Sequence, residues 1–262
     1  MKLGAFNTNF QLSAGDQGMA VKVPLVISHE VGFEKQRLIA NLIKGNKILA
    51  SDTAYLKIAD FDVKTSTKIA LLPDSSGLLE DILVMTKANY RTISDRFLID
   101  GDLDLYDLVI LGTGCLKQYK SLEFSSEKLR KYMEFGGQVL VFGQPDNWRN
   151  DLLPVSIIPT QNRLAATDLE LTEPKQAIFK TGYEIDVSAL LQRINVNYFS
   201  YPAVIFPAEK IITGRDKVTL LSISKFGRGR FIYCGIPLLE MFGDLDTDAI
   251  KLFSNLINYS GS

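Results

Sequence analysis

The stretch YDLVILGTGCLKQY, residues 106–119, decides the fold class. Its first nine residues are predominantly apolar, and a continuous apolar run is typical of a strand buried on both faces of a parallel sheet. Gly112 and Gly114 then end the strand in a turn. We therefore predict a buried strand over residues 106–114, with Cys115 exposed in the loop just beyond it.

Strand-like and helix-like segments alternate around this stretch. Apolar runs and helical spacing predict strands at residues 68–74, 90–94 and 138–144, and helices at 76–88 and 125–137. Ser125 is the expected cap of the second helix, and Gly136-Gly137 ends it. The inward face of the first helix is predicted to carry Leu78, Leu79, Ile82, Leu83 and Met85. The alternation predicts an α/β domain with a doubly wound, flavodoxin-like and mostly parallel sheet.

The last third of the chain completes this domain. Strands are predicted at residues 203–212, 217–227 and 229–238, with a tight hairpin at Gly227-Arg228-Gly229. Cys234 is expected to be a small buried residue of the last strand. Residues 246–259 predict a closing amphipathic helix capped by Asp246 or Thr247, with inward-facing Ile250, Phe253, Leu256 and Ile257. Between residues 145 and 200 the pattern indicates loops, short strands and a helix at 186–194.

Residues 1–64 have a different pattern from the rest. Four candidate strands lie in KLGAFNTNFQL, MAVKVPLVIS, QRLIANLIKGNKILAS and AYLKIADFDV, although RLIANLI also allows a short helix. Gly45-Asn46 predicts a hairpin turn within the third segment. Short strands at this spacing predict a small β-sandwich. A polar linker, KTSTK, follows, so we expect one domain over 1–64 and a second over 65–262.

Composition excludes several classes of function. The chain has 262 residues with 29 basic and 30 acidic side chains, so no basic surplus indicates a nucleic-acid partner. No apolar run reaches the roughly 18 residues that span a bilayer, so no membrane partner is expected. Two cysteines without a CxxC pair and a single histidine, His29, argue against a zinc site. We expect no metal and no cofactor.

The N-terminal residues leave the compartment open. They lack the continuous apolar segment of a signal peptide, and strand-like sequence begins at once. We expect a soluble protein whose natural chain extends upstream of residue 1. Secretion or periplasmic export would then depend on a signal upstream of this fragment.

Residues 68–259 resemble the class I glutamine amidotransferase-like superfamily. The segments that carry the resemblance are YDLVILGTG, LRKYMEFGGQVLVFG, SKFGRGRFIYCGIPLLEMF and LFSNLINY, the last with its Asn255-Leu256 pair. The likeness is greatest to the non-amidotransferase branches, such as the trimerisation domain of certain β-galactosidases. Residues 1–64 resemble the immunoglobulin-like domains that accompany glycoside hydrolases. The resemblance implies an accessory role beside a carbohydrate-active enzyme.

The catalytic triad of that superfamily is absent from this sequence. Active members carry a nucleophilic cysteine on a strained elbow after the strand that follows the helix and its glycine pair. Gly143 and Gln144 stand at that position here, followed by Pro145, which lacks a backbone donor for an oxyanion hole. The catalytic histidine would lie in the last third of the chain, and no histidine follows His29. The resemblance therefore implies a degenerate active site without catalytic residues.

The expected ligand-binding residues lie in two loops at the carboxyl ends of strands. Such loops meet at one rim of an open α/β sheet, where ligands bind. Trp148 among amide and acidic groups suits a sugar face, or alternatively fills the domain interior. Cys115 is either a reactive thiol or a small loop residue. The candidate set is Thr113, Cys115, Gln144, Asp146, Asn147, Trp148 and Arg149. The acidic stretches 100–107 and 243–248 are assigned to turns and helix caps rather than to calcium sites.

Three functions remain open on this sequence. We favour a non-catalytic accessory domain of a larger carbohydrate-active protein such as a glycoside hydrolase, acting in ligand binding, domain packing or oligomerisation. The first alternative is a hydrolase of carbohydrate or amide substrates that uses Cys115 or a carboxylate pair. The second is a purely structural assembly module. The partners expected are a carbohydrate or other small ligand, a second copy of the chain, or an upstream catalytic domain.

Overall fold

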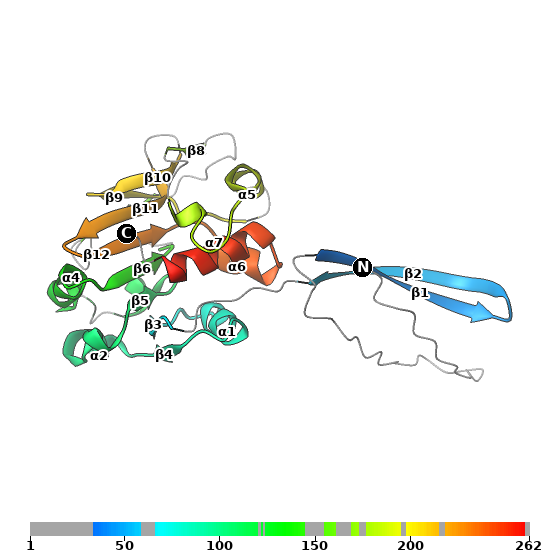
Figure 1. Ribbon diagram of the computed structural model, residues 1–262, viewed down its shortest axis with the longest axis horizontal. Helices are drawn as coiled ribbons and strands as arrows, with labels where there is room; N and C mark the ends of the chain where they lie inside the picture. The colour runs from blue at the N-terminus through cyan, green and yellow to red at the C-terminus, as the bar shows by residue number, and fades with distance from the viewer. Residues whose placement is uncertain are drawn as a thin grey trace. The chain divides into compact units, whose positions relative to one another are not determined.

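The computed structural model describes residues 34–58, 66–119, 122, 124–144, 155–160, 169–172, 177–194, 198–214 and 218–259. The chain divides into two compact units, Met1–Asp60 and Phe61–Ser262 (Figure 1). The division falls four residues before the boundary expected from the sequence.

The described part of the first unit is one long hairpin. Strands β1 (Glu34–Lys44) and β2 (Lys47–Ile58) pair antiparallel. The turn lies at Gly45-Asn46 as predicted, and Gly45 has the positive φ of 60° that such a turn requires. The segment RLIANLI is strand rather than helix. The first two candidate strands and His29 lie outside the described residues, so the small β-sandwich stays a prediction.

The second unit is built on a large mixed sheet. Among the described residues its strands run in the order β4-β3-β5-β6-β12-β11-β10-β8, and β9 pairs with both β11 and β7. The strands are β3 (Ile69–Leu72), β4 (Tyr90–Thr92), β5 (Leu108–Leu111), β6 (Gln138–Phe142), β7 (Ser156–Pro159), β8 (Glu170–Leu171), β9 (Ala203–Phe206), β10 (Glu209–Thr213), β11 (Thr219–Phe226) and β12 (Gly229–Cys234).

Only half of this sheet is parallel, which corrects the expectation of a mostly parallel sheet. The pairs β3–β4, β3–β5, β5–β6 and β6–β12 are parallel. Taken in chain order, these five strands have the flavodoxin-like arrangement 2-1-3-4-5. The remaining strands pair antiparallel, and of these pairs β11 and β12 are joined by the short turn Gly227-Arg228. The predicted strand 203–212 is two strands, since Pro207 and Ala208 separate β9 from β10.

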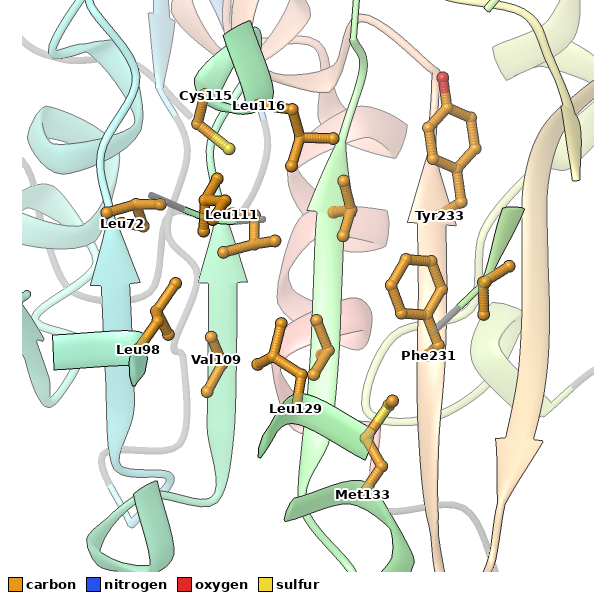
Figure 2. Close-up of a cluster of buried hydrophobic side chains, with 14 of the residues drawn as sticks. Leu72, Leu98, Val109, Leu111, Cys115, Leu116, Leu129, Met133, Phe231 and Tyr233 are labelled. Carbon is orange, nitrogen blue, oxygen red and sulfur yellow. The ribbon is translucent and has the colours of Figure 1, made fainter. Parts of the chain in front are cut away.

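Helices cover both faces of the parallel half (Figure 1). One face carries α2 (Asp95–Asp100), the 3-10 turn η1 (Leu103–Leu105), α3 (Cys115–Gln118) and α4 (Ser126–Glu134). The other carries α1 (Leu78–Met85), α6 (Leu238–Gly243) and α7 (Thr247–Asn258). On the first face, Leu98, Leu116 and Leu129 pack on Val109, Leu111 and Phe231 (Figure 2). On the second, the ring of Phe253 lies 6.2 Å from Phe142 and 5.7 Å from Phe242. The continuous apolar strands therefore separate two cores, as in a doubly wound domain.

Two details of the helices differ from the prediction. In α1, Leu79, Ile82 and Leu83 are buried, but Met85 is 59% exposed because it lies about 200° around the helix from Leu83. Ser125 is the residue before α4, yet its hydroxyl donates to Leu122 O (2.8 Å) and does not cap the helix. Its backbone is already in the right-handed helical region, which turns the side chain back onto the preceding 3-10 turn.

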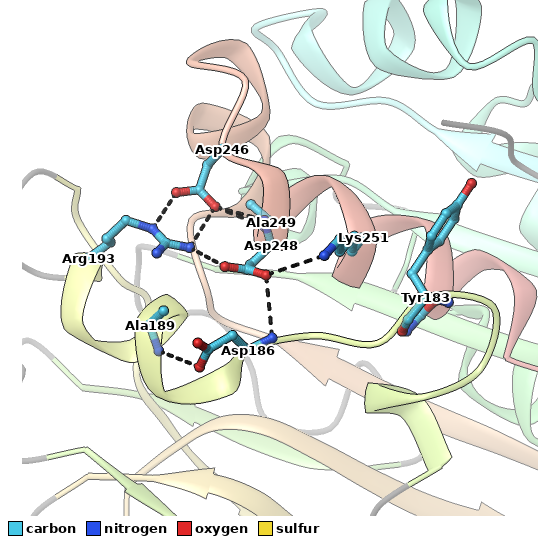
Figure 3. Close-up of polar contacts among 9 residues, drawn as sticks. Tyr183, Asp186, Ala189, Arg193, Asp246, Asp248, Ala249 and Lys251 are labelled. Carbon is cyan, nitrogen blue, oxygen red and sulfur yellow. Dashed lines mark hydrogen bonds and ion pairs between the residues drawn. The ribbon is translucent and has the colours of Figure 1, made fainter. Parts of the chain in front are cut away.

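The closing helix α7 forms as predicted. Asp246 caps it by accepting from the backbone N–H groups of Asp248 and Ala249. Arg193, at the end of α5 (Val187–Arg193), binds the same cap through Nε to Asp246 (2.5 Å) and Nη2 to Asp248 (2.7 Å), as Figure 3 shows. The carboxylates of the acidic stretch 243–248 thus cap a helix and hold α5 against it. In the described part of the chain, no helix is long and apolar enough to cross a membrane.

Candidate functional site

The candidate site lies at the carboxyl edge of the parallel strands. In the order 2-1-3-4-5, the chain reverses direction across the sheet between β3 and β5, and ligands of such folds bind at that crevice. Asp74 follows β3, Gly112 to Cys115 follow β5, and Gly143-Gln144 follow β6. The loops named from the sequence therefore lie beside one another at this edge.

Gln144 ties these loops together. Its Oε1 accepts from the N–H of Leu116 (3.2 Å), and its Nε2 donates to Gly112 O (3.1 Å) and Phe142 O (2.6 Å). A further bond runs from Gly114 N–H to Gly143 O (3.1 Å). Gln144 is 2% exposed. Its amide is therefore shielded from solvent, and its hydrogen bonds are to the protein backbone. Gln144 therefore joins the loop after β5 to the end of β6 through backbone hydrogen bonds.

Cys115 is buried, contrary to the prediction of an exposed thiol. It is the first residue of α3, is 0% exposed, and joins the core cluster below the loop with Leu72 and Leu111 (Figure 2). Burial, and secondarily the nearby charge of Asp74, raise the pKa of the thiol above its ordinary value. Cys234 is buried in β12 as predicted, and burial raises its pKa to about 12. Both sulfurs belong to the packed interior.

Of the other residues in the candidate set, one is described by the structure and four are not. Thr113 is partly exposed in the turn between β5 and α3, on the same rim as Gln144. Four lie outside the described residues, namely Asp146, Asn147, Trp148 and Arg149. The contribution of these four stays a prediction.

Tyr201 covers the elbow position, a role that sequence reasoning missed. A Cβ built on Gly143 would stand 2.2 Å from the Tyr201 ring, and one on Gly235 would stand 2.1 Å from Tyr201 O. The segment is fixed by Tyr201 N–H donating to Gly235 O (2.7 Å) and by the Tyr233 hydroxyl donating to Tyr201 O (2.6 Å). Two glycines thus make room for a tyrosine that closes the carboxyl edge over β6 and β12. No periodic pattern in residues 195–202 points to this.

Two carboxylates also stand at this edge. Asp74 Oδ1 accepts from Ser76 N, Ser76 Oγ and Gly77 N, whereas its buried Oδ2 has no partner among the described residues. Glu240, on α6, lies near the Tyr201 side chain, whose pKa is raised by burial and by the charge of Glu240. Glu240 is exposed at the surface, and partial desolvation of its carboxyl together with the charge of Asp74 raises its pKa. The signal that could have found Asp74 is its place directly after the first parallel strand. Among the described residues, no group of three or more His, Cys, Asp and Glu could hold a metal ion.

Comparisons with known proteins found solved structures that are similar to this chain at low sequence identity. No family model matches the chain, and no curated protein matches it. A cytoplasmic protein from Salmonella typhimurium is 13% identical over 86% of this chain and 96% of that one, with a TM-score of 0.42.

A ThuA-like protein from Bacteroides uniformis is 11% identical over 74% of this chain and 91% of its own, with a TM-score of 0.44. A β-galactosidase from Bacillus circulans sp. alkalophilus is 13% identical over 75% of this chain but only 31% of its own, with a TM-score of 0.41. All three TM-scores are below 0.5, so the fold assignment rests on the strand order of the chain itself.

Proposed function

We propose that this chain is a non-catalytic accessory part of a larger carbohydrate-active protein such as a glycoside hydrolase. The observation that carries the proposal is the closed carboxyl edge, where Tyr201 covers Gly143 and Gln144 is fully engaged with backbone groups. An acyl-transfer elbow needs an exposed nucleophile and free backbone donors aimed at an oxyanion. The carbohydrate context comes from the resemblance of the sequence.

The rival proposal is a hydrolase in the same cleft. Its cysteine version needs a thiolate at Cys115, and burial opposes both ionisation and access. Its carboxylate version would use Asp74 with Glu240, whose raised pKa suits a general acid. Tyr201 lies near Glu240 and packs over Gly143, so the phenol stands where a substrate would have to approach the carboxyl. We therefore rank the hydrolase second.

Labelling of Cys115 tests the proposal directly. Because the thiolate is the reacting form and the pKa is raised, we expect iodoacetamide to modify native Cys115 at least about 100-fold more slowly than a free thiol at pH 8. The rate should rise only at alkaline pH, above the roughly 8.5 of an unperturbed thiol. Mass spectrometry of the tryptic peptide gives the rate, and the Cys115→Ser variant reports Cys234 alone.

Two controls complete this experiment. The urea-unfolded chain should label both cysteines at the rate of a free thiol. Rapid labelling of native Cys115 with an apparent thiol pKa below about 8.5 would contradict the accessory proposal. So would hydrolysis of chromogenic glycosides that Glu240→Gln abolishes, because that result would assign catalysis to the carboxylate version.

Self-association is the accessory role with a specific structural feature behind it. On the outer face of β7 and β9, Ile158 is 45% exposed and lies opposite Val204, while Phe206 is 74% exposed. Among the described strands β7 pairs only with β9. An edge strand can pair with the same strand of a second copy about a two-fold axis. We therefore propose a homodimer through β7.

Light scattering after gel filtration measures the oligomeric state directly. We expect the wild-type chain to elute with the mass of a dimer and Phe206→Ser to elute as a monomer, because a lost aromatic anchor removes much of the buried apolar area. Phe124→Ser is the matched control, since Phe124 is 67% exposed and lies outside β7 and β9. A monomeric wild-type chain at all concentrations would remove dimerisation from the proposal.

A further inference from the structure

A groove of about 690 Å³ lies at the amino-terminal ends of β5 and β6, the opposite edge of the sheet from Gln144. Its volume is in the range of small-molecule sites. The walls come from the segment before β5, the segment between α4 and β6, and the end of α7. Its lining includes Asp104, Tyr106, Asp107, Phe135, Asn258 and Tyr259. This groove takes no part in the function proposed above.

The groove offers hydrogen-bond acceptors and negative charge. Asp104 and Asp107 both line it and are exposed, and none of its described lining residues is Lys or Arg. One oxygen of Asp107 accepts from Lys68 N–H (2.8 Å). Asn258 Oδ1 is buried and has no partner among the described residues. Such a surplus of acceptors fits a ligand that only donates, as ammonium and guanidinium groups do.

Two helices end at the groove and add to its negative potential. Phe135 follows the last residue of α4, and Tyr259 follows the last residue of α7. The carboxyl end of a helix carries about half a negative charge in its free carbonyl groups. Arg228 Nη2 donates to Phe135 O (3.1 Å) and offsets part of this charge at α4. The last turn of α7 contains no basic residue, although the guanidinium of Arg230 lies near the ring of Tyr259 at this end.

The walls of the groove include aromatic rings suited to an organic cation. Phe135 is 70% exposed and Tyr106 is partly exposed, whereas Tyr259 is only 7% exposed. The guanidinium of Arg230 already lies 4.8 Å from the centroid of the Tyr259 ring. An intramolecular cation–π contact therefore stands at one wall. Aromatic faces beside carboxylates favour a cation with a carbon skeleton over a strongly hydrated metal ion.

We propose that this groove binds an organic cation with primary ammonium or guanidinium groups, held by Asp104 and Asp107 against the ring of Phe135. The ligand is either a free polyamine or the Lys or Arg side chain of a partner. The shared chemistry is a flexible aliphatic stem that packs on the aromatic rings and a charged end that meets the carboxylates.

Titration of the full chain with spermidine tests the proposal. Nuclear magnetic resonance at low ionic strength would follow the backbone amides of Gly136 and Gly137, which line the groove. We expect saturable shifts, and at least a tenfold weaker affinity for the double variant Asp104→Asn with Asp107→Asn. The side-chain amide introduced by Asp107→Asn keeps an oxygen for Lys68 N–H, so the fold should persist. Added salt should weaken binding, because exposed charges are screened.

The control variant is Asp81→Asn, which removes one carboxylate charge from the exposed surface of α1, compared with two in the double variant. It should bind spermidine like the wild-type chain. Nα-acetyl-lysine methylamide separates the two sources, since binding of that probe alone would indicate a partner's side chain. Absence of saturable shifts with both probes, or equal affinity in the double variant, would overturn the proposal. Cysteine labelling and light scattering would be unaffected by that failure.

Discussion

Gly229→Ala is expected to lower the free energy of unfolding of the second unit by at least about 3 kcal/mol. A Cβ at this position would stand 2.1 Å from Gly137 O and 2.3 Å from Met133 O, and neither is the end of a flexible side chain. The Arg230 N–H donates to the same Gly137 oxygen (3.3 Å). The end of α4 and the start of β12 would have to separate, breaking the bond that joins them.

Thermal unfolding followed by circular dichroism at 222 nm measures the effect, since all described helices lie in the second unit. For about 200 residues, 3 kcal/mol corresponds to a fall in Tm of about 6–12 °C. Gly243→Ala is the control, because a Cβ there meets nothing within 4 Å and needs no positive φ. It should unfold within about 2 °C of the wild type. An equally stable Gly229→Ala would contradict the close packing of α4 on the β11–β12 turn.

The glycines in this contact show what could be predicted from the sequence. Gly136-Gly137 and Gly227-Arg228-Gly229 mark a helix end and a hairpin, and both are confirmed. Local patterns predict local turns because the turn itself demands glycine. That Gly137 and Gly229 also face each other follows from α4 packing beside β12, a pairing between residues nearly a hundred positions apart. No local pattern encodes it.

Contacts between residues that are distant in the sequence also explain why only part of the candidate site could be predicted. Gln144 can be placed on the rim from the strand pattern, because carboxyl ends of parallel strands meet at one edge. Its role in joining the loop after β5 to the end of β6 depends on three backbone partners, two of which lie near residue 114. The glycine turn before Cys115 predicts an exposed side chain. The short helix α3 instead directs it into the core, where a small sulfur-bearing residue packs well.

The antiparallel half of the sheet is the hardest part to predict. Residues 203–212, AVIFPAEKII, predict a single strand, and only Pro207 hints at the division into β9 and β10. Tyr201 lies in a loop whose conformation is set by Gly143, Gly235 and Tyr233, none of them a sequence neighbour. Side chains that fill a site from a distant loop leave no periodic signal.

Asn255→Ala is expected to lower the free energy of unfolding by about 3 kcal/mol, because it removes three buried hydrogen bonds at once. Asn255 is 0% exposed in α7. Its Nδ2 donates to Ile178 O (2.8 Å) and Tyr183 O (2.8 Å), and its Oδ1 accepts from Tyr183 N–H (3.0 Å). Alanine would remove all three of these bonds, and loss of one partner of a buried hydrogen bond costs about 1–3 kcal/mol.

Asn258→Ala is the matched control one turn further along α7. The Asn258 side chain makes one long bond, to Ser254 Oγ (3.3 Å), and its Oδ1 has no described partner, so we expect a change within about 0.5 kcal/mol. Hydrogen exchange locates the damage in Asn255→Ala. The amides of Tyr183 and Ile185 should exchange faster, while Ala189, bonded to Asp186, should change less.

The contacts of Arg193 explain why we expect amide exchange to increase more at Tyr183 and Ile185 than at Ala189. Its ion pairs with Asp246 and Asp248 hold α5 to the start of α7 independently of Asn255 (Figure 3). The segment between Ile178 and Tyr183 is therefore expected to loosen while α5 stays in place. Uniform loss of protection from exchange across α5 and α7 would instead mean that the Arg193 ion pairs and the Asn255 hydrogen bonds are lost together.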